Sequence, residues 1–228
     1  MNLLSIILQV TTDLISTAEA EEIKLSLWQL AKEGGWIMLI LAIFSIVAIY
    51  IFTERFITIN KASKKDDTFM DNIRCYMIEG KLDEAKTLCK EKDTPISRMI
   101  EKGISRIGKP LNDIQTAIGN VGNLEVSKLE KGVALIGMIS GAAPMLGFLG
   151  TVTGMIRAFY DMSMAGNNID IELLSAGIYE AMVTTVGGLI VGIIAFILYN
   201  IIVSRIDNVV NLLESKSIEF MDVLNEPA

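Results

Sequence analysis

The chain has 228 residues, 51% of them hydrophobic, and its formal net charge is −7. Its mean hydropathy of +0.48 is high for a soluble domain of this size. It contains no histidine, and its two cysteines are not spaced as a CxxC pair, which argues against a zinc site or an imidazole proton relay. We expect no bound metal, no cofactor and no nucleic-acid partner.

Three stretches of the chain carry no Asp, Glu, Lys or Arg. They are residues 34–53, 132–156 and 181–204, with 20, 25 and 24 residues. A hydrocarbon core about 30 Å thick is crossed by about 20 apolar residues in a helix. A crossing helix also satisfies its own backbone hydrogen bonds. The sequence therefore predicts an all-α membrane protein with three transmembrane helices.

The basic residues are concentrated between the first two of these stretches. Residues 54–131 hold 15 of the 20 Lys and Arg side chains, whereas residues 1–35 have a net charge of −3. Because short basic segments stay in the cytoplasm, we expect residues 54–131 and the C-terminus inside and the N-terminus outside.

Seven segments follow from these boundaries. They are an outer N-terminal segment (1–33), transmembrane helix 1 (34–53), a cytoplasmic helical region (54–131), transmembrane helix 2 (132–158), an outer link (159–173), transmembrane helix 3 (174–204) and a cytoplasmic helix and tail (205–228). In the first segment Leu3, Ile7, Val10 and Leu14 share one helical face, which predicts an amphipathic helix on the outer membrane surface. Ala18-Glu19-Ala20 matches a signal-peptide cleavage pattern, but no basic residue precedes the apolar run, so we expect the segment to be retained.

Between the first two spans the pattern predicts short amphipathic helices, one of which begins at Thr94-Pro95. The pattern from Leu111 runs into the second span without a proline, so we expect a single helix from there through the second span to about Met162. The third helix is expected to run from near Ile169 to about Val223. The second and third helices then extend beyond the bilayer into the cytoplasm, beside a small helical region.

Glycines at small-xxx-small spacing in the second and third spans predict close helix packing, either within the chain or between subunits. A proline in the second span removes one intrahelical hydrogen bond and bends the helix. The predicted packing residues are Gly137, Gly141, Pro144, Gly147, Gly150, Gly154, Gly188 and Gly192.

Glu180 is the strongest candidate for chemistry, because 24 uncharged residues follow it. A carboxylate at such depth faces the protein interior or water, although Glu180 could also sit at the headgroup level. Thr184 shares its helical face, and Thr185 is turned away by about 140°. Thr151 in the second span is expected at a comparable depth. The three hydroxyls could pass a proton through water or simply bond back to the helix backbone.

These segments resemble those of the MotA/TolQ/ExbB proton channel family, most closely its ExbB members. The resemblance rests on residues 143–154 (APMLGFLGTVTG), residues 177–185 (GIYEAMVTT) and Tyr199-Asn200, and it covers the chain from about residue 27. It implies a bacterial inner-membrane protein with a periplasmic N-terminus and a cytoplasmic C-terminus. Arg157 departs from the family pattern, in which this position is often uncharged.

The resemblance also implies a function and partners. ExbB-like chains form a ring, generally a homopentamer, around two single-span ExbD-like chains that carry the proton-binding aspartate. Thr151 and Thr185 would face that aspartate, with Glu180 beside it. Proton motive force would then drive a motor stator that works on a TonB-like protein for outer-membrane import.

Several alternatives stay open at this point. A TolQ-like stator subunit differs mainly in its partner, whereas a MotA-like subunit usually has four spans. A self-contained secondary transporter using Glu180 predicts internal repeats, which we do not find. A non-conducting membrane scaffold would not need Glu180 at all. Sodium is an alternative to the proton, and we expect no enzyme activity because neither a phosphate-binding loop nor a Ser/His/Asp arrangement is present.

Overall fold

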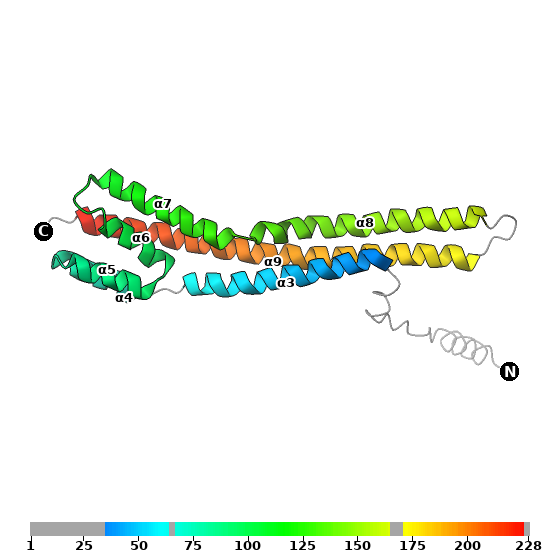
Figure 1. Ribbon diagram of the computed structural model, residues 1–228, viewed down its shortest axis with the longest axis horizontal. Coiled ribbons are helices and arrows are strands. Elements are labelled where there is room, and N and C mark those ends of the chain that lie inside the picture. The colour runs from blue at the N-terminus through cyan, green and yellow to red at the C-terminus, as the bar shows by residue number, and fades with distance from the viewer. Residues whose placement is uncertain (1–34, 64–66, 165–170, 226–228) are drawn as a thin grey trace, which may run out of the picture.

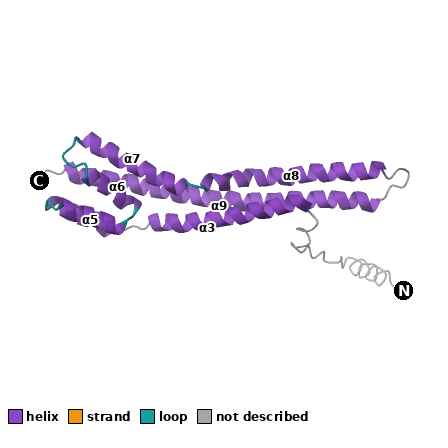
Figure 2. Ribbon diagram, viewed as in Figure 1, coloured by secondary structure: helices purple, strands orange, loops and turns teal. Residues whose placement is uncertain are grey.

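The computed structural model describes residues 35–63, 67–164 and 171–225, and every regular element in these ranges is an α-helix (Figure 1, Figure 2). The helices are α3 (Gly35–Ala62), α4 (Asp67–Ile78), α5 (Leu82–Lys92), α6 (Pro95–Ile104), α7 (Leu111–Glu130), α8 (Val133–Met164) and α9 (Ile171–Asn225). The all-α prediction is confirmed. The expected amphipathic helix at Leu3–Leu14 and part of the 159–173 link lie outside the described residues.

The molecule is a long rod in which α8 and α9 form an antiparallel hairpin and α3 lies along both (Figure 1). Helices α4 to α7 gather around the C-terminal part of α9, at the end of the rod opposite the α8–α9 link. By length and composition, α3, α8 and α9 could each cross a membrane. Large apolar side chains on these helices, such as Ile46, Met145 and Phe196, are exposed, as expected of surfaces that meet lipid or other protein chains.

Helix α9 joins the part of the rod formed with α3 and α8 to the part formed with α4 to α7. Its 55 residues extend about 80 Å, well beyond a hydrocarbon core of about 30 Å. Its C-terminal half buries Ile202, Ile206, Leu213 and Phe220 in a core shared with α4 to α7. The predicted third helix, from near residue 169 to about residue 223, agrees with these bounds.

The expected single helix from Leu111 to Met162 is wrong, because the chain breaks between α7 and α8 (Figure 2). Lys131 leaves the helical conformation at φ −55° and ψ 122°. Gly132 then adopts φ +83°, which glycine reaches without steric cost. The part of the chain that precedes the second span is therefore a separate helix.

The start of α6 follows the sequence closely. Thr94 accepts a hydrogen bond from the backbone N–H of Ser97, the Ser97 hydroxyl accepts one from the Thr94 N–H, and Pro95 occupies the first turn. The apolar face of this helix, including Met99 and Ile100, is buried as its spacing predicted.

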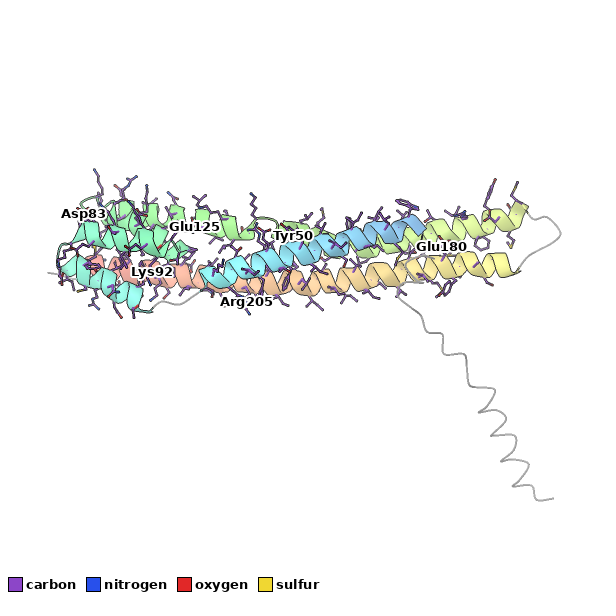
Figure 3. All side chains as sticks on the ribbon, turned by 60° about the horizontal axis from the view of Figure 1, so that its bottom comes forward. Tyr50, Asp83, Lys92, Glu125, Glu180 and Arg205 are labelled. Carbon is purple, nitrogen blue, oxygen red and sulfur yellow. The ribbon has the colours of Figure 1, made fainter. Side chains whose placement is uncertain are left out.

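Arg205 links α9 to α3 at the C-terminal end of the third uncharged stretch (Figure 3). It is the first charged residue after residues 181–204, and its Nη1 donates to Asn60 Oδ1 at 3.0 Å. Its guanidinium also lies over the Phe56 ring, 5.1 Å from the centroid. Both contacts hold the last turns of α3 against α9.

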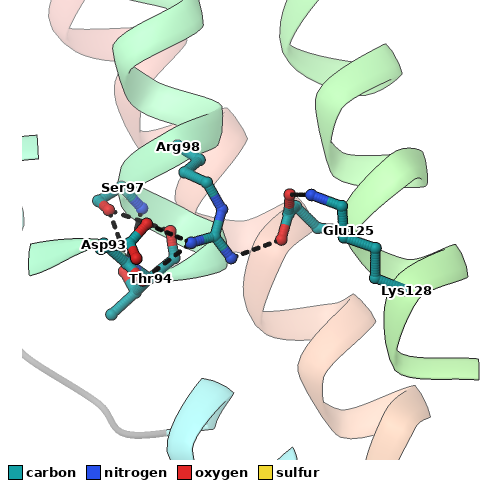
Figure 4. Close-up of polar contacts among 6 residues, drawn as sticks. All are labelled: Asp93, Thr94, Ser97, Arg98, Glu125 and Lys128. Carbon is teal, nitrogen blue, oxygen red and sulfur yellow. Dashed lines mark hydrogen bonds and ion pairs between the residues drawn. The ribbon is translucent and has the colours of Figure 1, made fainter. Parts of the chain in front are cut away.

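A buried carboxylate joins α6 to α7 (Figure 4). Glu125 is 4% exposed, and its two oxygens accept hydrogen bonds from Arg98 Nη2 and Lys128 Nζ, both at 2.6 Å. Arg98 also contacts Asp93, with Nη1 2.5 Å from Oδ1. Burial alone would raise the pKa of Glu125, but the hydrogen bonds from Arg98 and Lys128 outweigh it and hold that pKa below its ordinary value of 4.5.

Helix α3 also contacts the part of α7 that bears Glu125 and Lys128. Arg55 Nη1 donates to the backbone carbonyl of Lys128 at 3.1 Å, near the C-terminal end of α7. A cation at this end of a helix is favourable because the last carbonyls carry partial negative charge. The last turns of α7 are thus fixed to α3 and to α6 at once.

We expect Glu125→Gln to destabilise the packing of α6 against α7 by about 1–3 kcal/mol at pH 7, because it removes the charge that two cations share. Since the folded-state pKa is lowered, the stabilisation is present above pH 4.5 and is lost as the pH falls through the folded-state value. The effect is measured as a shift in the thermal unfolding of the full chain, with proteolytic cleavage of this region as the readout. Glu130→Gln, on an exposed position of the same helix, is the control and should change little. Equal stability of both variants would contradict the prediction.

Candidate functional site

Glycines bring α8 and α9 into backbone contact. A Cβ on Gly188 would lie 2.6 Å from the Ala143 carbonyl oxygen and 2.8 Å from Gly147 Cα. One turn along α9, a Cβ on Gly192 would lie 2.5 Å from Pro144 Cγ. These positions require the absence of a side chain, so the two helices approach as closely as helices can.

The other glycines differ in what they meet. A Cβ on Gly154 would be 2.9 Å from Ala181 Cβ, one on Gly150 would overlap the Thr184 side chain, and one on Gly137 would be 3.0 Å from the Tyr199 ring. Gly141 has no neighbour within 4 Å. The structure therefore places all the predicted packing residues except Gly141 between α8 and α9.

Three threonines meet around one backbone carbonyl at this contact. The hydroxyls of Thr151 and Thr185 are hydrogen-bonded to each other across the two helices. Thr185 Oγ1 lies 3.1 Å from the Gly147 oxygen, and Thr151 Oγ1 lies 3.3 Å from it. The buried Thr184 donates to the Ala181 oxygen at 2.7 Å and lies 3.5 Å from the Gly147 oxygen. The sequence expectation that Thr151 and Glu180 lie at comparable depth fits this geometry, because Thr151 contacts Thr185, five residues after Glu180.

Glu180 lies in a different environment from the Thr151–Thr185 pair. It is partly buried in a pocket of about 210 Å³, at the point where the first turn of α3 meets α8 and α9 (Figure 3). A Cβ on Gly35 would lie 3.0 Å from Glu180 Oε1, so the start of α3 rests against the carboxylate. The pocket is lined by Gly35, Trp36, Ile37, Gly150, Thr153, Gly154, Arg157, Glu180 and Thr184.

The pocket agrees with the helical geometry of α9 and adds residues that the sequence did not single out. Glu180 and Thr184 share the pocket, and Thr185 is turned toward Thr151 instead, as the 140° rotation predicted. The first turn of α3 and Thr153 were missed. Thr153 could have been found, because Gly150, Gly154 and Arg157 recur at helical spacing and place it on the same face of α8. Nothing in the sequence indicates that α3 begins against Glu180.

No three His, Cys, Asp or Glu side chains gather in a way that could hold a metal ion within the described ranges. The chemistry that the site offers is therefore that of one carboxylate, one guanidinium and several hydroxyls.

Known proteins are similar to this chain in sequence. The sequence profile of the MotA/TolQ/ExbB proton channel family matches residues 91–215. The chain is 28% identical to a putative biopolymer transport protein ExbB homolog of Methanothermobacter thermautotrophicus, over 82% of this chain and 66% of the relative. It is 26% identical to a putative biopolymer transport protein ExbB-like 1 of Synechocystis, over 75% of this chain and 68% of the relative.

A third relative is a TolQ protein. The Tol-Pal system protein TolQ of Haemophilus influenzae is 32% identical over 44% of this chain and 42% of its own length. The chain thus spans about two thirds or less of the length of these relatives. Because the family profile covers more than half of the chain, including both threonine-bearing spans and Glu180, the chain belongs to the MotA/TolQ/ExbB proton channel family.

Proposed function

We propose that this chain is an ExbB-like subunit of a bacterial inner-membrane proton channel that uses proton motive force to do work on a TonB-like protein. The observation that supports this most is the position of Glu180, next to the α8–α9 contact that bears the Thr151–Thr185 pair and directly before 24 uncharged residues. An ionisable side chain at this depth is costly and is characteristic of ion pathways. The family is one of proton channel components rather than of enzymes.

The chain supplies only part of a pathway. Among the residues that border the second and third uncharged stretches, Glu180 is the one carboxylate, and large apolar side chains of α3, α8 and α9 remain exposed. A homopentamer around two single-span ExbD-like chains would cover such surfaces and add the aspartate that binds and releases protons. One charge crossing 100 mV provides about 2.3 kcal/mol, so several protons per work cycle would drive such a motor.

The experiment that tests the proposal starts with purification from membranes in mild detergent. We expect an ExbD-like single-span chain to co-purify at fewer copies than this chain. Proteoliposomes containing the complex should then conduct protons down a pH gradient, and an equal sodium gradient should give less flux. Recovery of this chain alone, in a form that conducts no protons, would contradict the proposal.

A TolQ-like role is the second candidate, and the TolQ relative from Haemophilus influenzae favours it. The same purification separates the two, because a TolR-like partner in place of an ExbD-like one would assign the chain to envelope maintenance. A MotA-like role is less well supported, since the described residues contain three helices long and apolar enough to span a membrane, not four.

Burial distinguishes the two thiols of the chain, and the proposed orientation places both of them on the cytoplasmic side. Cys75 is exposed on α4, whereas Cys89 is buried, and burial with the charge of Glu101 raises the pKa of Cys89 to about 12. A membrane-impermeant maleimide should therefore label one thiol per chain in inside-out vesicles and none in right-side-out vesicles. Cys75→Ser should abolish the labelling and Cys89→Ser should not. Labelling of Cys75 in right-side-out vesicles would place α4 on the outer side of the membrane and overturn the orientation.

A further inference from the structure

Two opposite charges share one pocket inside a single protomer. Arg157 of α8 and Glu180 of α9 both line the pocket of about 210 Å³, together with the hydroxyls of Thr153 and Thr184. A water occupies about 30 Å³ in the liquid, and a buried water needs two to four polar partners. The pocket has room for several waters beside the carboxylate and offers polar groups to them.

The pocket begins at the membrane boundary. Arg157 is the first charged residue after residues 132–156, and its long side chain is exposed, so its guanidinium reaches the headgroup level. Gly150 and Thr153 lie one to two turns deeper on the same face of α8. The pocket therefore leads from the end of the rod that bears the α8–α9 link toward Glu180.

The charges around the pocket can be assigned helix by helix for the described residues. Arg157 and Glu180 are the charged side chains in its lining. Helix α3 contributes the turn Gly35–Ile37, whose backbone N–H end adds a partial positive charge. Asp161 follows one turn beyond Arg157 on α8 and is the next charged side chain on that helix. Arg157 is thus the charged side chain of the pocket lining that lies at its mouth.

The Thr151–Thr185 pair does not provide a second route to Glu180 within the protomer. Thr184 lies buried between the pocket and the pair, and its hydroxyl donates to the Ala181 carbonyl oxygen. The Gly147 carbonyl oxygen faces all three threonine hydroxyls. A carbonyl accepts hydrogen bonds and cannot donate one, so a chain of hydroxyls that converges on it does not pass a proton onward.

We propose that this pocket is the water-filled access route by which protons from the outer side reach Glu180, with Arg157 as a positioning residue at its mouth. The guanidinium draws the carboxylate toward the pocket and favours anionic over cationic solutes there. The inference rests on the proposed channel function and specifies the route to its carboxylate.

Thiol labelling of the full complex in oriented membrane vesicles tests the route. The two native cysteines are replaced (Cys75→Ser, Cys89→Ala), and Thr153→Cys places one thiol in the pocket. Ile156→Cys, on an exposed apolar position of the same helix, is the matched control. We expect methanethiosulfonate reagents added from the outer side to modify the pocket thiol at least about tenfold faster than the control, because a lipid-facing thiol does not ionise.

The charge of the reagent tests the role of Arg157. The anionic sulfonatoethyl reagent should modify the pocket thiol faster than the cationic trimethylammonioethyl reagent. Arg157→Glu should reverse this preference, changing each rate by roughly fivefold, as expected for a unit charge a few ångströms away. Arg157→Lys should preserve the preference. Complete modification of the pocket thiol should reduce proton flux at least about fivefold if water in the pocket carries the proton.

Any one of four results would overturn the inference. The pocket is not the route if the Thr153→Cys thiol reacts as slowly as the Ile156→Cys thiol, if it reacts faster from the cytoplasmic side, if Arg157→Glu leaves the reagent preference unchanged, or if full flux survives complete modification. Should Thr153→Cys not assemble, Trp36→Cys, on the α3 side of the same pocket, takes its place. A wild-type complex without any proton flux would instead contradict the proposed function, since labelling rates are measured independently of flux.

Discussion

Glu180→Gln is expected to reduce proton flux through the reconstituted complex by at least about tenfold, while the complex still assembles. Glutamine keeps the size and hydrogen-bonding groups of the side chain but cannot bind and release a proton. The pocket around Glu180 already contains water-sized space and hydroxyls, so a neutral amide fits without unfolding the helices. Flux is measured as dissipation of an imposed pH gradient, and assembly by size-exclusion chromatography.

The control for this variant is Glu214→Gln, the same change at an exposed position in the C-terminal half of the same helix. Its flux should stay within about twofold of wild type, because surface substitutions away from a site have small effects. Glu180→Asp keeps the titratable group on a shorter side chain and should retain part of the flux. Normal flux and normal TonB-linked or Tol-linked complementation by Glu180→Gln would support a non-conducting scaffold instead.

The membrane helices could be predicted because their signal is local. An uncharged stretch of 20 residues or more is sufficient to indicate a span, whatever the rest of the chain does. The Thr94-Pro95 cap is equally local and predicted the start of α6. The break at Gly132 has no such signal, since Gly137 and Gly141 lie within α8 as ordinary helical residues. What distinguishes Gly132 is its positive φ, at a turn held by Arg55 from another helix.

The candidate site was predictable in part for the same reason. Glu180 stands out in the sequence because its surroundings are uncharged, and the rotation between Thr184 and Thr185 follows from helical geometry. The contact between Glu180 and Gly35 depends on where α3 begins and on how it lies across the hairpin, which no spacing within α9 records. The ion pairs of Glu125 were likewise hidden, because a charged residue in an amphipathic helix is usually exposed.

Of the single methyl groups that could be added at the α8–α9 contact, the one added by Gly188→Ala should be the most damaging. Its Cβ would lie 2.6 Å from the Ala143 carbonyl oxygen, 2.8 Å from Gly147 Cα and 3.0 Å from Gly147 N. All three are backbone atoms, so the strain cannot be relieved by rotating a side chain, and the two helices must separate. Overpacking of this kind costs about 1–3 kcal/mol or more. For a chain of this size, that lowers the unfolding temperature of the complex by roughly 2–4 °C per kcal/mol.

Separating the helices at Gly188 also disturbs the threonines, because Gly147 belongs to both contacts. Its carbonyl oxygen lies within 3.5 Å of the hydroxyls of Thr151, Thr184 and Thr185. We therefore expect Gly188→Ala to lose proton flux as well as thermal stability. Gly141→Ala is the matched control on the partner helix, because its added Cβ meets no atom of the chain within 4 Å and alanine favours a helix over glycine. Equal losses in both variants would show that the damage does not arise at the α8–α9 contact, and a loss in Gly141→Ala alone would move the critical packing to a surface between subunits.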